Sequence, residues 1–367
     1  MKNYLLILIL LIFASCSQNQ SNKTCYYPVP EEVTMLTEDN MPKVETFTLE
    51  KIPLPTKYLM NYCYVYQDSL VVSINYSNPN PYIISVYNLN TQQEIAGYFK
   101  KGNGPNELMS FNGYLHNNNL FIRDGNLHAL TQLNMDSVIL KGNNYTPIIT
   151  FCDALLMSDF VYLGNDTIVS ANGMFIKGFD VDEVNEFELY DAKTGKALKE
   201  YPLNEKNFPP PTVLRTMTFS NSKFIVFWEK FPIISIYDKN FNIISQFRDA
   251  IFDDNVMSFV DDNNTIASKE YFSFYFNFSC KTENNIIVHN FRYNIKYKDL
   301  KSPEEIDANA TYETWIFDAD MNLKRRLKPE VKLENVRKVS YSEKSNTFYL
   351  NCNDEDGELA LYKCILK

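Results

Sequence analysis

The sequence predicts an all-β fold: a six-bladed β-propeller with four-stranded antiparallel blades, closed by an N-terminal strand. Short apolar runs separated by Asn, Asp, Gly and Ser dominate the chain, and long helical patterns are scarce. One unit recurs at intervals of roughly 50 residues. Six repeats of four strands are typical of a propeller, whereas a pair of sandwiches lacks such a repeat and a parallel β-helix needs shorter rungs.

The first half of the unit is a hairpin with a short turn. It opens the series as "NYCYVYQDSLVVSI" and closes it as "RKVSYSEKSNTFYLN". Asn, Asp, Gly and Ser between two apolar runs favour tight turns, so each copy predicts a β-hairpin. The second strands of the six hairpins are expected to begin near Leu70, Leu120, Ile168, Phe224, Ile286 and Phe348.

The second half of the unit is an apolar strand that ends in Asn or Asp, followed by a turn and another strand. Clear copies are "ISVYNLNTQQEIAGYF", "FELYDAKTGKALKEYPL", "ISIYDKNFNIISQF" and "TWIFDADMNLKRRL", and "TQLNMDSVILK" is a weaker one. The two halves together predict four strands per unit. The fifth unit fits least well, because two insertions interrupt it.

The last unit stops after its third strand, "ELALYKCILK". The segment "VETFTLEKIPL", residues 44–54, is expected to supply the missing outer strand. Such a pairing would close the ring and remove an exposed sheet edge. The propeller is therefore expected to span 44–367.

The N-terminus carries the features of an export signal. Residues 5–14 form an apolar run that is too short to span a bilayer, and Ala14-Ser15 precede Cys16. We expect 1–15 to be a lipoprotein signal peptide, Cys16 to carry the lipid, and 16–43 to be a flexible tether. The protein would then sit in the cell envelope, anchored to the outer membrane on either face. The alternative is an ordinary signal peptide with an incidental cysteine.

Composition narrows the functional classes. The formal net charge of −10 argues against a nucleic-acid partner. The three histidines are scattered and no C-x-x-C pair occurs, so neither a metal nor another cofactor is predicted. The cysteines other than Cys16 are expected to be buried packing residues, with disulfides as the alternative. The acidic stretch 353–358 is expected to be a solvated turn rather than a Ca²⁺ loop.

The stretch "YFKKGNGPNELMSF", residues 98–111, joins the first unit to the second. It is not a phosphate-binding loop, because it lacks the P-loop spacing and a following helix. Gly102 and Gly104 permit positive φ, and Glu107 can accept backbone N–H bonds, which suits a structural turn. The alternative is that Asn103, Asn106 or Glu107 faces a ligand.

The run from Gly102 to Glu107 resembles the G-x-G-P-x-E signature of TolB-like six-bladed β-propeller lipoproteins of Bacteroidetes. The lipid-anchor signal and the six units agree with that resemblance, which covers nearly all of the chain after the tether. The resemblance implies the fold and an envelope location. It implies no established activity and no catalytic residues.

In such a ring, the ends of the second strands and the 98–111 loop would meet at one mouth of the central channel. Carboxylates, amides, guanidinium groups and a tryptophan gathered there would suit a glycan, a peptide or an envelope protein. The candidate ligand-binding residues are Asn103, Asn106, Glu107, Arg123, Asp124, Asn172, Trp228, Glu229, His289 and Arg292.

Several of these residues also have a structural interpretation. Arg123 and Asp124 could form an ion pair between blades, Trp228 could pack against a neighbouring blade, and His289 could be a hydrogen-bonded interior residue. No G-x-S-x-G elbow or Ser-His-Asp arrangement is present. The leading prediction is therefore ligand or partner binding without catalysis. The alternatives are a polysaccharide lyase or hydrolase that uses the candidate carboxylates or His289, and a scaffold of an envelope complex with a large apolar surface patch.

Overall fold

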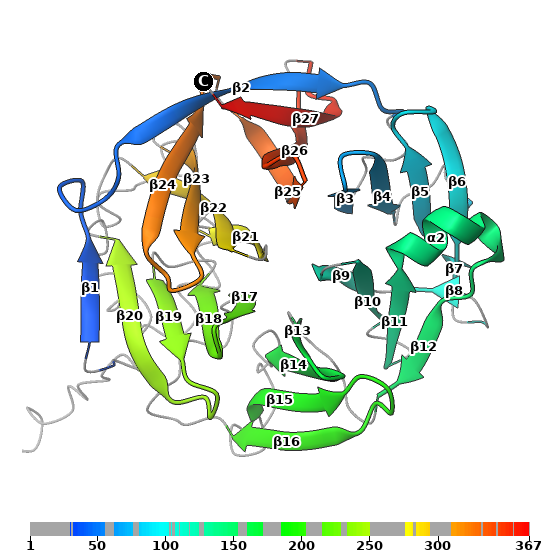
Figure 1. Ribbon diagram of the computed structural model, residues 1–367, viewed down its shortest axis with the longest axis horizontal. Helices are drawn as coiled ribbons and strands as arrows, with labels where there is room; N and C mark the ends of the chain where they lie inside the picture. Colours follow the sequence, from blue (N-terminus) through cyan, green and yellow to red (C-terminus); the bar gives the residue numbers. More distant parts are fainter. Residues whose placement is uncertain are drawn as a thin grey trace, which may run out of the picture.

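The protein is a ring of β-sheets arranged around a central opening (Figure 1). The structure is a computed structural model. It describes residues 30, 32–55, 62–75, 81–102, 104, 107–109, 111–116, 118–124, 128–152, 160–171, 185–202, 215–228, 233–249, 276–281, 284–293, 310–331, 333–342, 344–354 and 356–366.

Three of the sheets hold four antiparallel strands in chain order. The first contains β3 (Tyr62–Tyr66), β4 (Leu70–Ile74), β5 (Ile84–Asn88) and β6 (Gln93–Tyr98). The second contains β9 (Phe111–His116), β10 (Asn119–Asp124), β11 (Ala129–Asn134) and β12 (Ile148–Phe151). The third contains β13 (Phe160–Gly164), β14 (Thr167–Ala171), β15 (Asn185–Asp191) and β16 (Ala197–Pro202).

Two larger sheets include strands from the N-terminal segment. One contains β17 (Arg215–Ser220), β18 (Lys223–Trp228), β19 (Ile233–Tyr237), β20 (Ile243–Asp249) and β1 (Glu32–Leu36). The other has the order β21 (Phe276–Lys281), β22 (Asn285–Tyr293), β23 (Ala310–Asp318), β24 (Leu323–Pro329), β2 (Val44–Ile52), β27 (Leu359–Leu366), β26 (Thr347–Asn353) and β25 (Glu334–Ser342). A short parallel pair is formed by β7 (Lys100–Lys101) and β8 (Glu107–Leu108).

Strand β2 closes the ring, as the sequence predicts. Residues 47–52 pair antiparallel with β27, so the segment supplies the strand that the last unit lacks. Residues 44–47 also pair in parallel with β24, which joins two four-strand arrays into one sheet. Phe47 is fully buried at this junction. Its ring packs edge-on against the ring of Phe348, with the ring centroids 5.3 Å apart.

The segment predicted to be a tether is partly structured. Its residues 32–36 form β1, which pairs in parallel with β20. The expectation of a flexible tether throughout 16–43 is therefore wrong for this part. The segment is polar and irregular by itself, and its strand exists because β20 offers an unpaired edge.

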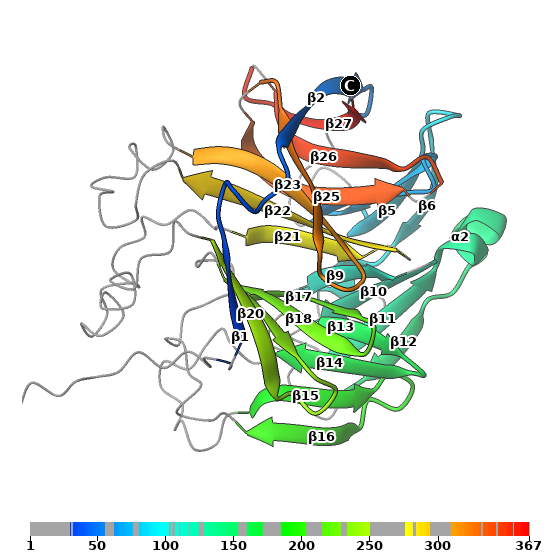
Figure 2. The ribbon, with the colours of Figure 1, turned by 60° about the vertical axis from the view of Figure 1, so that its left-hand side comes forward.

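The weaker copy of the repeat, "TQLNMDSVILK", differs from the prediction. After β11 the repeat predicts a turn and a strand, but the structure has a helix there. Helix α2 (Met135–Lys141) begins after Asn134, whose Oδ1 accepts from the N–H of Ser137 at 2.9 Å. The 3₁₀ helix η2 (Gly142–Asn144) follows, and the outer strand begins only at β12. Asn134 occupies the turn-forming position of the repeat, but here its side chain caps a helix. Figure 2 shows α2 projecting from one end of the ring.

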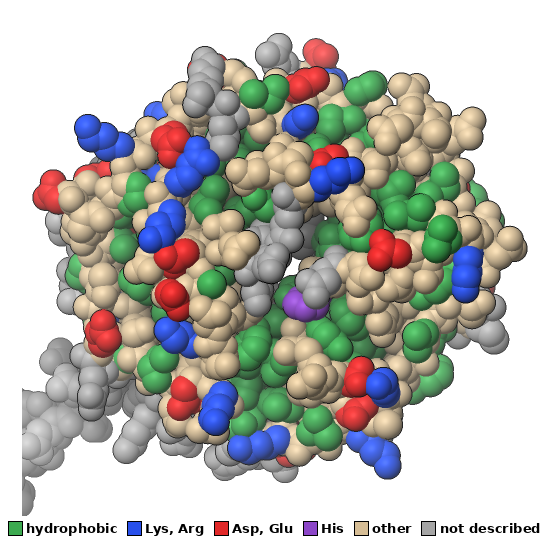
Figure 3. Space-filling model, viewed as in Figure 1, with side chains coloured by type: hydrophobic (Ala, Val, Ile, Leu, Met, Phe, Trp, Pro, Cys, Tyr) green, Lys and Arg blue, Asp and Glu red, His purple; other side chains and the backbone are tan. Residues whose placement is uncertain are grey.

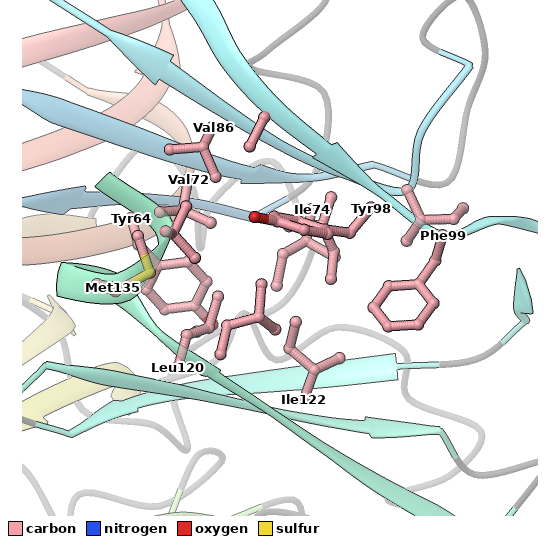
Figure 4. Close-up of a cluster of buried hydrophobic side chains, with 14 of the residues drawn as sticks. Tyr64, Val72, Ile74, Val86, Tyr98, Phe99, Leu120, Ile122 and Met135 are labelled. Carbon is pink, nitrogen blue, oxygen red and sulfur yellow. The ribbon is translucent and has the colours of Figure 1, made fainter. Parts of the chain in front are cut away.

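The core consists of apolar clusters between successive sheets. The cluster between the first and second sheets includes Val72, Ile74, Leu120 and Ile122, all fully buried (Figure 4). A similar cluster lies between each later pair of consecutive four-strand arrays, and one between the last and the first. Alternate side chains of a strand point to opposite faces, so middle strands such as β4 and β18 bury residues on both faces and read as nearly continuous apolar runs.

Candidate functional site

The connection between β6 and β9 is built around the carboxylate of Glu107. Its Oε2 accepts from the N–H of Gly104 at 2.7 Å, and the Glu107 N–H donates to the carbonyl of Gly104 at 3.0 Å. A Cβ on Gly102 would lie 2.0 Å from Oε2, and the φ of Gly102 is +154°. The glycines of the motif are therefore needed because the carboxylate lies directly over the backbone. This geometry agrees with the structural interpretation of Glu107.

Asp124 supports the same connection from the end of β10. Its side chain is fully buried, and Oδ2 accepts from the N–H of Met109 at 3.1 Å. Arg123 precedes it, lies opposite Asn112 and Leu130, and is only partly buried. Of these two neighbours, Arg123 is thus the one with a side chain that solvent can reach.

Trp228 lies at the end of β18 inside the core. The side chain has no exposed surface, packs with Val226 and Ile233, and donates from Nε1 to Ser235 Oγ at 2.9 Å. Gln246 donates to the same hydroxyl at 3.0 Å. This placement agrees with the packing interpretation, and a ligand-binding role for Trp228 stays a prediction.

His289 is also an interior residue. It is fully buried in β22, and its Nδ1 lies 2.6 Å from the hydroxyl of Tyr312 and 2.8 Å from that of Thr314. The imidazole stacks on the Tyr312 ring with the centroids 5.7 Å apart. These contacts agree with a structural role, and a ligand-binding role stays a prediction here as well.

The other candidates are less fully described. Arg292 lies in β22, where it pairs with Thr311 of β23. The candidates that lie outside the described residues are Asn103, Asn106, Asn172, Glu229 and the lipidation residue Cys16. The structure thus brings Glu107, Arg123 and Asp124 together at one connection, whereas Trp228 and His289 lie in separate clusters between sheets.

The connections at the two ends of the ring differ in length. At one end, tight turns link the first strand of each unit to the second, such as 67–69 and 221–222. At the other end, the connections 172–184, 203–214, 250–275 and 294–309 follow strands that finish there. The β6–β9 connection belongs to this second end, because it leads from an outer strand to the next inner one.

Aspartates at the tight-turn end explain the Asn/Asp of the repeat. Oδ1 of Asp318 accepts from the N–H groups of Asp320 and Asn322 at 3.0 and 2.9 Å. Burial by itself raises the pKa of Asp318, but hydrogen bonds from Asn322, Lys324 and the backbone outweigh it and lower the pKa to about 2. Asp238 caps the equivalent turn in the same way, and its pKa is also lowered. Asn88 makes the corresponding bonds without a charge.

The acidic segment 353–358 forms a turn, as the sequence predicts. Oδ1 of Asp354 accepts from the N–H groups of Asp356 and Glu358, and Oδ2 pairs with Lys51 Nζ at 2.7 Å. Within the described ranges, no three His, Cys, Asp or Glu side chains are grouped so that they could hold a metal ion. No helix in the same ranges is long and apolar enough to cross a bilayer.

Four of the cysteines are free and buried: Cys63, Cys152, Cys352 and Cys364. Burial raises the pKa of Cys63 to about 12. The packing interpretation of these four cysteines is therefore confirmed.

Comparisons with known proteins reveal a likeness of fold. No family model and no curated protein matches the chain. A member of the DUF4221 family from Bacteroides vulgatus is 13% identical, with a TM-score of 0.55, over 88% of this chain and 98% of that chain. A protein of unknown function from Bacteroides thetaiotaomicron is 8% identical, with a TM-score of 0.48, over 88% of this chain and 76% of that one. A streptogramin B lyase is 10% identical, with a TM-score of 0.45, over 88% of this chain and 98% of that chain.

At these identities only the fold is shared, and only the first structure is close enough to carry an argument. The likeness and the ring of sheets are consistent with a propeller family. They leave the resemblance to TolB-like lipoproteins a prediction.

Proposed function

We propose that the chain is a six-bladed β-propeller that binds a small polar ligand, a glycan or a peptide, or a protein partner at one end of its ring, without catalysis. The blade count follows if β2 is assigned to the last unit, because each unit then has four antiparallel strands. Support comes from the six apolar clusters among the described residues, one between each pair of consecutive arrays.

The observation that carries the proposal is the difference between the two ends of the ring. The tight-turn end uses short connections that the polar side chains of the turns cap, such as Asp318 and Asn88. The connections 172–184, 203–214, 250–275 and 294–309 leave from the other end, whereas the long connection at the tight-turn end, 135–147, forms α2 and η2. Loops on a rigid scaffold commonly carry binding residues, so the end with the additional chain length is the better candidate.

The chemistry of that end suits a polar ligand with little charge. Arg123 has a partly exposed side chain beside a connection that Glu107 and Asp124 hold in shape. Asn172 and Glu229 belong to connections that leave from the same end. Amide, carboxylate and guanidinium groups bind hydroxyl and peptide groups by directional hydrogen bonds.

A glycan array and a peptide library, followed by calorimetric titration of each hit, test the proposal. We expect Arg123→Ala to weaken binding about tenfold or more, the loss of one or two hydrogen bonds from a charged donor. The control is Lys193→Ala, which removes an exposed cation paired with Asp166 at the tight-turn end and should leave affinity unchanged. Equal affinity of the wild type and Arg123→Ala, or a matching loss in Lys193→Ala, would place the site elsewhere.

We further propose that Cys16 carries a lipid that anchors the ring to the outer membrane. The support is the sequence signal alone. Metabolic labelling with a radioactive fatty acid should mark the wild-type chain and not a Cys16→Ser variant. Equal labelling of the two chains would refute the assignment.

A further inference from the structure

The outer edges of the sheets are protected in different ways. β1 covers β20, and β2 covers both β24 and β27. At β6, the N–H of Gly97 donates to Oδ1 of Asn143 in η2 at 2.8 Å. β16 carries Lys199 and Glu200, and charged side chains discourage edge-to-edge pairing. Among the described outer strands, this leaves β12 as the edge that has no charge and no strand or helix paired with it, although Gly195 lies against Phe151 at its end.

Strand β12 is uncharged and unusually exposed. Its apolar side chains Ile148, Ile149 and Phe151 are 57%, 40% and 67% exposed. Leu140 of the preceding helix is 84% exposed. No charged residue occurs in 142–152, although the whole chain has a net charge of −10. An apolar, β-branched edge strand of this kind is a template for pairing with another strand.

The backbone of β12 has a defined set of outward-facing groups. The Cys152 N–H donates to the carbonyl of His128 on the β11 side at 2.7 Å. Alternate residues of an antiparallel strand direct their backbone groups to opposite sides. The N–H and C=O of Ile149 and Phe151, and the C=O of Pro147, therefore point away from β11.

Two of the outward-facing positions offer only one backbone group to a second strand. Proline has no N–H, so Pro147 offers only its carbonyl. The carbonyl of Phe151 lies against the neighbouring sheet, because a Cβ on Gly195 would be 1.8 Å from this oxygen. What is left are two donors, on Ile149 and Phe151, and two acceptors, on Pro147 and Ile149. This set is symmetric about Ile149.

We propose that β12 pairs with β12 of a second copy of this chain, antiparallel, with the two-fold axis at Ile149. The N–H and C=O of Ile149 then bond to those of its copy, and each Phe151 N–H bonds to the Pro147 carbonyl opposite. All four outward groups of each strand are used. On one face, Pro147, Ile149 and Phe151 of both copies meet, and no like charges oppose one another. The proposal goes beyond ligand binding, because it concerns the outer wall of the ring.

Cysteine cross-linking tests the register. At an axis on Ile149, the two Cα atoms of this position are about 5.5 Å apart, within the range of a disulfide. We expect Ile149→Cys in the purified full chain to form a cross-linked dimer under mild oxidation. Ile148→Cys is the matched control, because its copy lies two residues further along the strand, and it should not cross-link. Cross-linking of neither variant, or of both equally, would overturn the pairing.

Sedimentation equilibrium in detergent provides an independent test. Ile149→Lys puts two ammonium groups opposite each other at the axis, and we expect the dimer dissociation constant to rise about tenfold or more. Leu198→Lys makes the same change on the neighbouring outer strand, at a side chain that is 55% exposed, and should have no effect. A wild-type chain that stays monomeric at high micromolar concentration, or equal losses in the two variants, would contradict the proposal. Thermal unfolding of each variant excludes misfolding as the cause.

Discussion

Arg326 forms two ion pairs, one with a buried glutamate and one with an exposed glutamate. Comparing them tests whether burial or contact distance sets how much an ion pair contributes to the free energy of unfolding. Arg326 is 2% exposed, and its guanidinium binds Glu313 in a fork with two bonds of 2.9 Å. The same group binds Glu38 at 2.8 Å. The side chain of Glu313 is 5% exposed and that of Glu38 is 65% exposed. The shortest contacts of the two carboxylates with Arg326 are thus nearly equal in length, but the carboxylates differ greatly in solvent access.

We expect Glu313→Gln to lower the free energy of unfolding by about 3 kcal/mol, because it removes one partner of a buried pair. The Trp315 Nε1–H, which donates to Glu313 Oε2 at 2.7 Å, would also lose a charged acceptor. Glu38→Gln should lower the free energy of unfolding by about 1 kcal/mol or less, because solvent screens the carboxylate of Glu38, which is 65% exposed. In 1 M NaCl, most of the stability loss caused by Glu38→Gln should disappear, whereas the loss caused by Glu313→Gln should change little.

Urea denaturation followed by tryptophan fluorescence measures both changes, since Trp315 is fully buried beside the network. The midpoint should shift far more for Glu313→Gln than for Glu38→Gln, with the slope of the transition unchanged. Equal shifts would show that burial does not set the contribution of these pairs. The reasoning would then fail for this network.

Three further predictions concern stability. Phe47→Ala should lower the free energy of unfolding by about 3–5 kcal/mol, because the fully buried ring fills the junction that β2 closes. Urea denaturation measures this change, and a loss below about 1 kcal/mol would contradict this role of β2. Gly102→Ala should destabilise by about 1 kcal/mol or more because its Cβ would meet the Glu107 carboxylate, and an unchanged melting temperature would show that the connection adapts. The pKa of Asp318 is lowered from 3.8 to about 2 on folding, so its stabilising contribution is present above pH 4 and is lost as the pH falls towards 2. Asp318→Asn keeps the acceptor that Asn88 uses and should flatten the acid limb of a stability–pH profile; an unchanged limb would exclude this aspartate as a cause.

The local repeat could be predicted from the sequence because hairpins and turns depend on nearby residues. Turn-forming Asn, Asp and Ser between apolar runs indicated the second strands to within one residue, as at Leu70 and at Thr347 of β26. The closing role of 44–54 followed from counting strands. The helix α2 was missed although Asn134 is a good N-cap and Lys141 lies in the last turn, because the repeat suggested a strand at this position.

The surroundings of the candidate site residues depended on the tertiary structure. The sequence placed Trp228 and His289 near the ends of second strands and therefore at the mouth of the channel. Whether a side chain at a strand end is exposed depends on how far the adjacent sheet extends over it. Nothing in the polar segment around Glu32 signals β1, and nothing in "LKRRLKP" distinguishes the buried Arg326 from the exposed Arg325. A residue's burial and partners are set by contacts with segments far away in the chain, whereas turn chemistry is set within a few residues. The sequence by itself therefore determined the units and their order, and the packing of each unit against its neighbours decided which polar groups are interior.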